Sequence, residues 1–370
     1  MTIDNEVKQD FDFEAHRDRA VKAYRGIRHR YEVYATNLRN ILREALSVKN
    51  IQIHSIEARA KDIESFASKA IKPSTENPNL PKYPNPLSEI TDLAGIRIIA
   101  FLPKTIQEIE EVLADQFQVI ERIDKGQELS DQGKFGYQSI HFLLRLAPSR
   151  ASLPEYVTCK DLVAEVEVRT ILQHAWAELQ HDIQYKSYTV IPQSIRRRFA
   201  ALAGLLEIAD REFQAIQDED QQQRTDARQA IATGTLANVE ITPDALNAYA
   251  DKRLGPDGRM REWSYAWMAG LIKKLGFKNF DQVEKCIAGY DDDQISRILW
   301  GSRQGQLTRL EDMLRAGMGE NFINRHFYAN SDWFKERSPR YLEKLRDAGI
   351  PIGTCSPEGD EDTDEIALLR

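Results

Sequence analysis

Three cations stand close together in the stretch ARAKDIESFASK. Arg59 and Lys61 lie two residues apart, and Lys69 follows at the end of the segment. Residues two apart on a strand point to the same face, so these side chains are placed to converge on one ligand. Convergent cations suit a polyphosphate, because each phosphate oxygen takes charge-assisted hydrogen bonds. Taken alone, the segment fits an ordinary solvated surface equally well.

Acidic residues flank or interrupt two apolar strands further along the chain. Asp92 precedes the run DLAGIRII and Arg97 interrupts it, while Glu165, Glu167 and Arg169 alternate with valine in EVEVRT. The last three therefore share one face of a strand. Like charges at this spacing repel, so the face requires a cation or Mg²⁺ as partner, and Asp92 and Glu165 are the predicted magnesium ligands. A structural Asp92–Arg97 ion pair is the alternative.

The stretch KFGYQSIHFLL, residues 134–144, opens an apolar strand with a flexible and aromatic entry. A hairpin explains the glycine but not the placing of Tyr137 and His141 four residues apart. We interpret Tyr137 as a platform on which a flat ligand stacks. Cations for phosphates, two acids for a metal and an aromatic for a base together indicate a nucleotidyl or pyrophosphoryl transfer site.

The elements that must position these residues follow from hydrophobic periodicity. Strands are expected at 51–60, 90–102, 117–123, 137–146 and 162–170, and helices at 12–47, 62–72, 105–117 and 171–217, with a break near 188–192. This alternation predicts an α+β fold in which a mixed β-sheet is flanked by helices.

The rest of the chain differs in character from residues 12–217. A polar segment, 218–239, is expected to be a linker or a solvated helix, and residues 240–350 read as a second, all-helical domain that starts at the Thr242–Pro243 cap. Residues 354–370 are expected to be a disordered acidic tail.

Composition limits the class of protein. The chain has 370 residues, 42% of them hydrophobic, and no apolar run of the ~20 residues that a membrane span requires. The acidic start lacks the order of a secretion signal, so a cytoplasmic protein with no membrane partner is expected. A net charge of −8 argues against general nucleic-acid coating. The basic segment 17–30 is either a solvated face or an anion-binding face for nucleotide phosphates or RNA.

The cysteines give no sign of a shared site. Cys159, Cys286 and Cys355 are isolated in the sequence and show no CxxC spacing. We expect buried or incidental thiols in a reducing cytoplasm rather than a disulfide framework or a structural zinc site.

Four motifs, in order and spacing, resemble the synthetase domain of the RelA/SpoT family over about residues 20–215. They are RAKxxxSxxxK, DLAGIRI, FGYQSIH and EVEVRTxxQHAWAExxH. The resemblance implies a nucleotidyltransferase-like synthetase domain and a GTP diphosphokinase-type reaction. In that reaction the β,γ-pyrophosphate of ATP moves to the 3′-hydroxyl of GDP or GTP and gives the stringent-response alarmone (p)ppGpp.

The resemblance also assigns roles to individual residues. Asp92 and Glu165 are implied to bind Mg²⁺, with Glu165 the general base on the acceptor hydroxyl. ATP is implied to be held by Arg59, Lys61, Ser65, Lys69 and Arg97. The acceptor nucleotide is implied to contact Lys134, Tyr137, His141, Arg169 and His174.

Departures from the family pattern leave alternatives open. Glu167 replaces the usual glutamine, and Gln180 stands where an acid often precedes the equivalent of His181, which bears on selection of the base. No hydrolase activity is expected, because the further His and acidic ligands that the family's hydrolase domain needs are not found upstream of His181. One alternative is a toxin-like relative, such as a CapRel-like fused toxin–antitoxin of phage defence, that pyrophosphorylates the 3′ end of tRNA. Another is a degenerate nucleotide-binding module. The helical region, 240–350, is expected to regulate the enzyme through a homo-oligomer or a protein partner.

Overall fold

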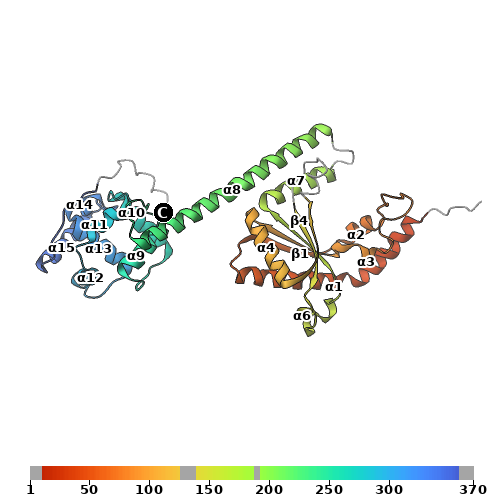
Figure 1. Ribbon diagram of the computed structural model, residues 1–370, viewed down its shortest axis with the longest axis horizontal. Coiled ribbons are helices and arrows are strands. Elements are labelled where there is room, and N and C mark those ends of the chain that lie inside the picture. The colour runs from red at the N-terminus through yellow and green to blue at the C-terminus, as the bar shows by residue number, and fades with distance from the viewer. Residues whose placement is uncertain (1–10, 126–138, 187–191, 358–370) are drawn as a thin grey trace, which may run out of the picture. The chain divides into compact units, whose positions relative to one another are not determined.

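A computed structural model describes residues 11–125, 139–186 and 192–357. The chain divides into two compact units, Met1–Ile216 and Gln217–Arg370 (Figure 1). Among the described residues, none of the helices is both long and apolar enough to cross a bilayer.

The first unit is built on a five-stranded mixed sheet, as the sequence predicts. Its strands are β1 (Ile53–Ala60), β2 (Ala94–Ala100), β3 (Phe117–Asp124), β4 (Ile140–Leu146) and β5 (Ala164–Thr170), in the spatial order β1-β2-β5-β4-β3. The β2–β5 pair is parallel and the other pairs are antiparallel. The central strand, β5, therefore has β2 on one side and β4 on the other.

Helices that pack on the sheet close the first core. The longest is α1 (Phe13–Val48), which begins after Asp12 and contacts β1 and β2; α4 (Pro103–Gln116) contacts β2, β3 and β5. Alternate residues of β2 and β5 are buried in this core, among them Ile96, Ile98, Val166 and Val168. The remaining helical segments are α2 (Ile63–Ala70), α3 (Pro86–Glu89), η1 (Thr91–Leu93), α6 (Pro148–Ala151), η2 (Pro154–Cys159) and α7 (Ile171–Lys186).

Some predicted boundaries differ from the structure. The strand expected at 90–102 is shorter, because residues 91–93 form a 3₁₀ turn that brings Asp92 to the start of β2. The helix expected to begin at Thr105 begins at Pro103, since proline is favourable in the first helical turn.

The polar segment 218–239 is largely helical. Helix α8 (Gln193–Thr233) includes residues 218–233, and most of these side chains are exposed. The solvated-helix alternative therefore describes this part of the chain better than an irregular linker.

The second unit is helical, as expected after residue 240. Helix α9 (Pro243–Leu254) is capped by Thr242, whose hydroxyl accepts a hydrogen bond from the Ala245 amide at 3.2 Å. The helices that follow are α10 (Glu262–Lys274), α11 (Phe280–Ile287), α12 (Asp292–Trp300), α13 (Gln306–Met318), α14 (Glu320–Arg325) and α15 (Asp332–Asp347). They enclose their own apolar core, into which Ile231 at the end of α8 also packs.

The expected disorder of the C-terminal tail is wrong for its first residues. The Cys355 amide donates to the Gly317 carbonyl at 3.0 Å, and Arg325 donates to Ser356 Oγ at 2.8 Å and to the Pro357 carbonyl at 2.6 Å. Residues 354–357 are therefore tied to the helical unit. The remainder of the tail, 358–370, lies outside the described residues.

A buried histidine should make the stability of the helical unit depend on pH. His326 is 4% exposed and stacks on Phe334, with ring centroids 4.3 Å apart. Burial, and then the charge of Arg315, lower the pKa of His326 to about 4. An unfolded histidine has a pKa of about 6.5. Folding below that pH therefore expels a proton, and the stability held by the neutral ring is lost as the pH falls toward 4.

We expect the free energy of unfolding of the wild type to fall by about 3 kcal/mol more than that of His326→Gln between about pH 7 and about pH 4. Urea unfolding at each pH, followed by circular dichroism, measures both. Glu311, whose Oε1 lies 3.9 Å from His326 Nε2, is present in both proteins and contributes to both pH dependences. The difference between the two changes in free energy therefore reports on the His326 ring. If the free energy of unfolding fell by the same amount in the two proteins, the result would contradict a buried neutral His326.

Candidate active site

The parallel register of β2 and β5 brings the predicted charged residues to one face of the sheet. Gly95 lies opposite Glu165, and Arg97 lies opposite Glu167. On the neighbouring strand β1, Glu57 pairs with Arg97, so Glu57, Arg97 and Glu167 lie side by side across three strands. These odd-numbered positions face away from the core that buries Ile96 and Val166.

A pocket of about 350 Å³ opens on this face. It is lined by Glu57, Ala58, Arg59, Lys61, Asp92, Gly95, Ile96, Arg97, His141, Glu165 and Glu167. Gly95 forms an open position in its floor: a Cβ built there would approach only the Arg59 carbonyl oxygen, at 3.9 Å. A larger side chain at this position would project into the pocket.

Two lysines hold Asp92 at the edge of the pocket. Lys61 Nζ donates to Asp92 Oδ2 at 2.6 Å, and Lys69 Nζ lies 3.1 Å from Asp92 Oδ1. Burial alone would raise the pKa of Asp92, but the hydrogen bond and charge of Lys61, with the charge of Lys69, outweigh it and leave the pKa below its usual value. Asp92 is therefore a carboxylate at neutral pH.

Two arginines share a pair of glutamates beside the pocket. Arg97 Nε donates to Glu167 Oε2 at 3.0 Å, and Arg169 lies 3.2 Å from Glu167 Oε1. Glu178 on α7 accepts from both guanidinium groups, each at 3.2 Å. The Asp92–Arg97 ion pair, the structural alternative, is thus wrong: each residue has other partners. Glu167, which replaces the usual glutamine of the family pattern, has a physical role, because its negative charge lies between two arginines.

His174 completes this network from α7. Its Nδ1 lies 2.8 Å from an Arg169 terminal nitrogen. Burial, and then the charge of Arg169, lower the pKa of His174, so the ring is neutral and Nδ1 accepts the hydrogen bond. Arg169 itself is only 4% exposed, and burial is the main cause that lowers its pKa. Arg169 and His174 flank the pocket rather than line it.

Glu165 is oriented by a histidine on the neighbouring antiparallel strand. His141 Nδ1 lies 2.5 Å from Glu165 Oε1, and its Nε2 lies 2.9 Å from Ser139 Oγ. Because a carboxylate only accepts, the Nδ1 nitrogen donates the hydrogen bond to Glu165. Histidine thereby fixes one carboxylate oxygen of Glu165 within the pocket.

The remaining predicted residues are placed differently. Arg59 lines the pocket, and among the described residues it forms no ion pair. Ser65 is exposed in the first turn of α2, where Asp62 accepts from its amide at 3.1 Å, and it does not line the pocket. Lys134 and Tyr137 lie outside the described residues.

Reasoning from the sequence missed four residues of the pocket and its hydrogen-bond network. Glu57, Gly95, Ser139 and Glu178 all line the pocket or contact its residues. Gly95, Ser139 and Glu178 lie inside the quoted motifs, so the sequence did contain a signal for them. Glu57 becomes visible only through strand register, because it pairs with Arg97.

The donor set suits a hard cation such as Mg²⁺. Asp92 Oδ1 is buried and makes no hydrogen bond of acceptable geometry, although Lys69 is near. Such an oxygen is a suitable ligand for a cation that prefers carboxylates and retains water or phosphate oxygens. Glu165 lines the same pocket and offers the second carboxylate.

Comparisons with known proteins identify relatives of the part of the chain that holds this pocket. Residues 58–190 match the family described as "Region found in RelA / SpoT proteins". The GTP pyrophosphokinase YjbM of Bacillus subtilis (strain 168) is 27% identical over 175 residues, which cover 46% of this chain and 74% of that protein. For the GTP pyrophosphokinase YwaC of the same organism the values are 27% over 168 residues, with 45% and 75% covered.

Among solved structures, the small alarmone synthetase 1 from Bacillus subtilis is 22% identical and matches 54% of this chain and 98% of that one, with a TM-score of 0.45. The chain thus carries a RelA/SpoT domain at residues 58–190 and is homologous to YjbM and YwaC. The resemblance read from the four motifs is confirmed.

We expect Glu167→Gln to lower the free energy of unfolding by about 1–3 kcal/mol, because it removes the charge between two arginines, one of them buried. Glu57→Gln is the matched control. Its carboxylate is 60% exposed and 3.9 Å from Arg97, so a change within about 0.5 kcal/mol is expected. Urea titration of the wild type and the two variants measures these free energies of unfolding. Equal effects of the two substitutions would contradict the bridging role of Glu167.

Proposed function

We propose that this protein is a magnesium-dependent pyrophosphokinase that transfers the β,γ-pyrophosphate of ATP to the 3′-hydroxyl of GDP or GTP. The observation that carries the proposal is the pairing of Asp92 and Glu165 in one pocket with Arg59, Lys61 and Arg97. The homology to two proteins named GTP pyrophosphokinase supports both the reaction class and the acceptor.

The proposed roles follow from charge and position. Arg59, Lys61, Lys69 and Arg97 neutralise the triphosphate, while Asp92 and Glu165 hold Mg²⁺, which supplies charge stabilisation for the transferred group. The acceptor hydroxyl is a weak nucleophile, so Glu165 takes its proton as general base. His141 acts as a positioning residue, because it fixes one oxygen of Glu165.

The acceptor nucleotide is proposed to bind beside the donor, at the edge of the pocket. Arg169 and His174, which flank the pocket, are proposed to contact the acceptor, whereas Ser65 is proposed to contact ATP, as the motif implies. Tyr137 is proposed to stack on the acceptor base and Lys134 to contact the acceptor nucleotide, as the family resemblance implies.

One assay tests the reaction and the acceptor together. Purified protein is incubated with Mg²⁺, γ-labelled ATP and either GDP and GTP or bulk tRNA. We expect label on the guanosine nucleotides and none on tRNA. Label on tRNA alone would replace the alarmone function with that of a translation-blocking toxin. Label on neither acceptor would contradict the proposed reaction.

Replacing the proposed base gives a second prediction. Glu165→Gln keeps the side-chain shape but cannot accept the proton, so we expect the rate to fall by at least ~10² with an unchanged melting temperature. Glu121→Gln, on the exposed part of β3, should retain wild-type activity. Activity of Glu165→Gln within a few-fold of the wild type would place the base elsewhere.

The helical unit is proposed to regulate the synthetase rather than to take part in chemistry, because every site residue precedes Lys186. A truncation near Ala230 would cut into the helical core, since Ala230 and Ile231 pack there. We therefore compare full-length protein with a chain ending at Ile216. We expect the truncated chain to keep or increase its transfer rate. Complete loss of activity in a folded truncation would contradict a purely regulatory role.

A further inference from the structure

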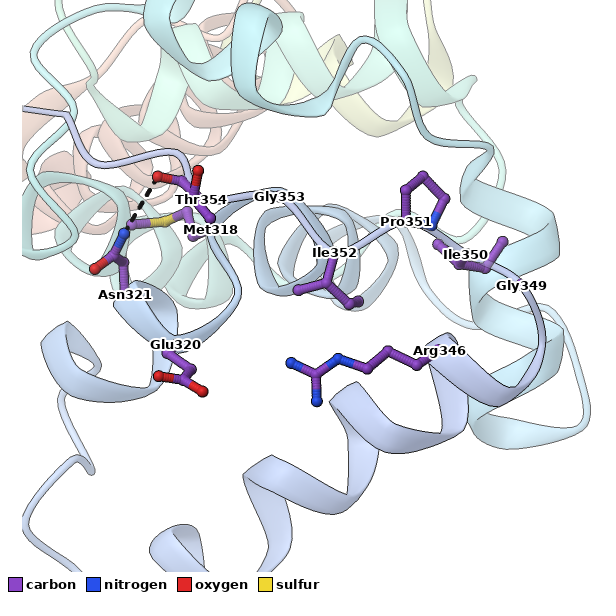
Figure 2. A pocket seen from close by; sticks show the side chains of 10 residues that line it. All are labelled: Met318, Glu320, Asn321, Arg346, Gly349, Ile350, Pro351, Ile352, Gly353 and Thr354. Atoms are coloured by element: carbon purple, nitrogen blue, oxygen red, sulfur yellow. Dashed lines mark hydrogen bonds between the residues drawn. The ribbon is translucent and has the colours of Figure 1, made fainter.

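The segment that follows α15 forms a wall of a second pocket, which lies entirely in the helical unit. This pocket has a volume of about 610 Å³ and is bordered by Met318, Glu320, Asn321, Arg346 and residues 349–354 (Figure 2). We call residues 350–357 the strap. In Figure 2 its extended backbone passes along the end of α13, and Asn321 Nδ2 donates to the Thr354 carbonyl.

Hydrogen bonds and glycines hold the strap close to α13. The Gly353 amide donates to the Ala316 carbonyl at 2.9 Å, and the Cys355 amide donates to the Gly317 carbonyl at 3.0 Å. A Cβ on Gly353 would collide with the Gly317 carbonyl, and one on Gly319 would lie 2.7 Å from the Gly353 carbonyl oxygen. Only glycine at these positions allows so close an approach.

The same packing brings two distant cysteines together around Gly317. A Cβ on Gly317 would lie 2.7 Å from Cys286 Sγ, so the thiol on α11 rests directly against this residue. Gly317 is also the residue whose carbonyl binds the Cys355 amide, and Cys355 packs against the core cluster that contains Cys286. Burial, and then the adjacent Cys355 thiol, raise the pKa of Cys286.

The two cysteines are 69 positions apart in the sequence, and their proximity follows only from the packing of the strap. Both are free thiols in the structure, with Cys286 buried and Cys355 half-buried. Cys159 is buried in the core of the other unit and provides an internal comparison.

We propose that Cys286 and Cys355 are an oxidation site at which a peroxide forms a disulfide that locks the strap onto α11. This inference is independent of the proposed pyrophosphokinase function. Cys355, the more accessible thiol, attacks hydrogen peroxide as a thiolate and becomes a sulfenic acid, releasing one water. The Cys286 sulfur then attacks the Cys355 sulfur and releases a second water. Two thiols are thereby oxidised, and one peroxide is reduced to two waters.

The disulfide fixes the C-terminal wall of the second pocket. The strap is anchored by backbone hydrogen bonds and by Arg325, which donates to the Ser356 hydroxyl at 2.8 Å. Such contacts open at modest free-energy cost, whereas a covalent link removes the open state. Oxidation should therefore protect the strap and stabilise the helical unit.

The test treats the folded full-length chain with hydrogen peroxide, blocks the remaining thiols with an alkylating agent and maps peptides without reduction. We expect a Cys286–Cys355 linked peptide that dithiothreitol removes, formed equally in Cys159→Ser and absent in Cys355→Ser. The melting temperature of the oxidised wild type should exceed that of the reduced protein by about 5–10 °C, with no such shift in Cys355→Ser.

Two results would overturn the proposal. One is a folded, peroxide-treated protein in which Cys355 carries only sulfinic or sulfonic acid and no linked peptide forms. The other is a linked peptide that appears only after denaturation. If Cys355→Ser fails to fold, Cys286→Ala replaces it as the control, because an apolar side chain suits that buried position.

Discussion

The parallel pairing of β2 with β5 is the constraint on which the site depends. It sets Gly95 against Glu165 and Arg97 against Glu167, so that one face of the sheet is charged while the other is an aliphatic core. Because side chains alternate along a strand, a shift of one residue in this register would bury the glutamates and expose the isoleucines and valines. The hydrophobic core therefore also fixes the geometry of the chemistry.

The charges on this face largely neutralise each other before any nucleotide arrives. Lys61 and Lys69 hold Asp92, whereas Arg97 and Arg169 share Glu167 and Glu178. These pairs keep partly buried charges satisfied. In the proposed reaction, the metal would join the acids and the phosphates would take the cations, so that a triphosphate with Mg²⁺ would exchange partners with little net change in charge.

Much of the fold and part of the site followed from the sequence. Alternation in EVEVRT placed Glu165, Glu167 and Arg169 on one face, and the helical period of residues 12–47 marked α1. The partners of these charges did not follow. Glu57 and Glu178 reach Arg97 from another strand and another helix, and such contacts depend on register and packing that no local pattern encodes. The Cys286–Cys355 pair was missed for the same reason, because a close approach of backbones at three glycines creates it.

The central claim is that the pocket floored by Gly95 binds the donor nucleotide. Isothermal titration of wild type, Gly95→Ala and Gly95→Leu with Mg²⁺ and a non-hydrolysable ATP analogue tests it most directly. The alanine methyl group meets only open space near Arg59, so binding should remain within a few-fold of the wild type. The leucine side chain would occupy the pocket, and we predict loss of measurable binding with an unchanged melting temperature. Wild-type affinity in a folded Gly95→Leu protein would contradict the account.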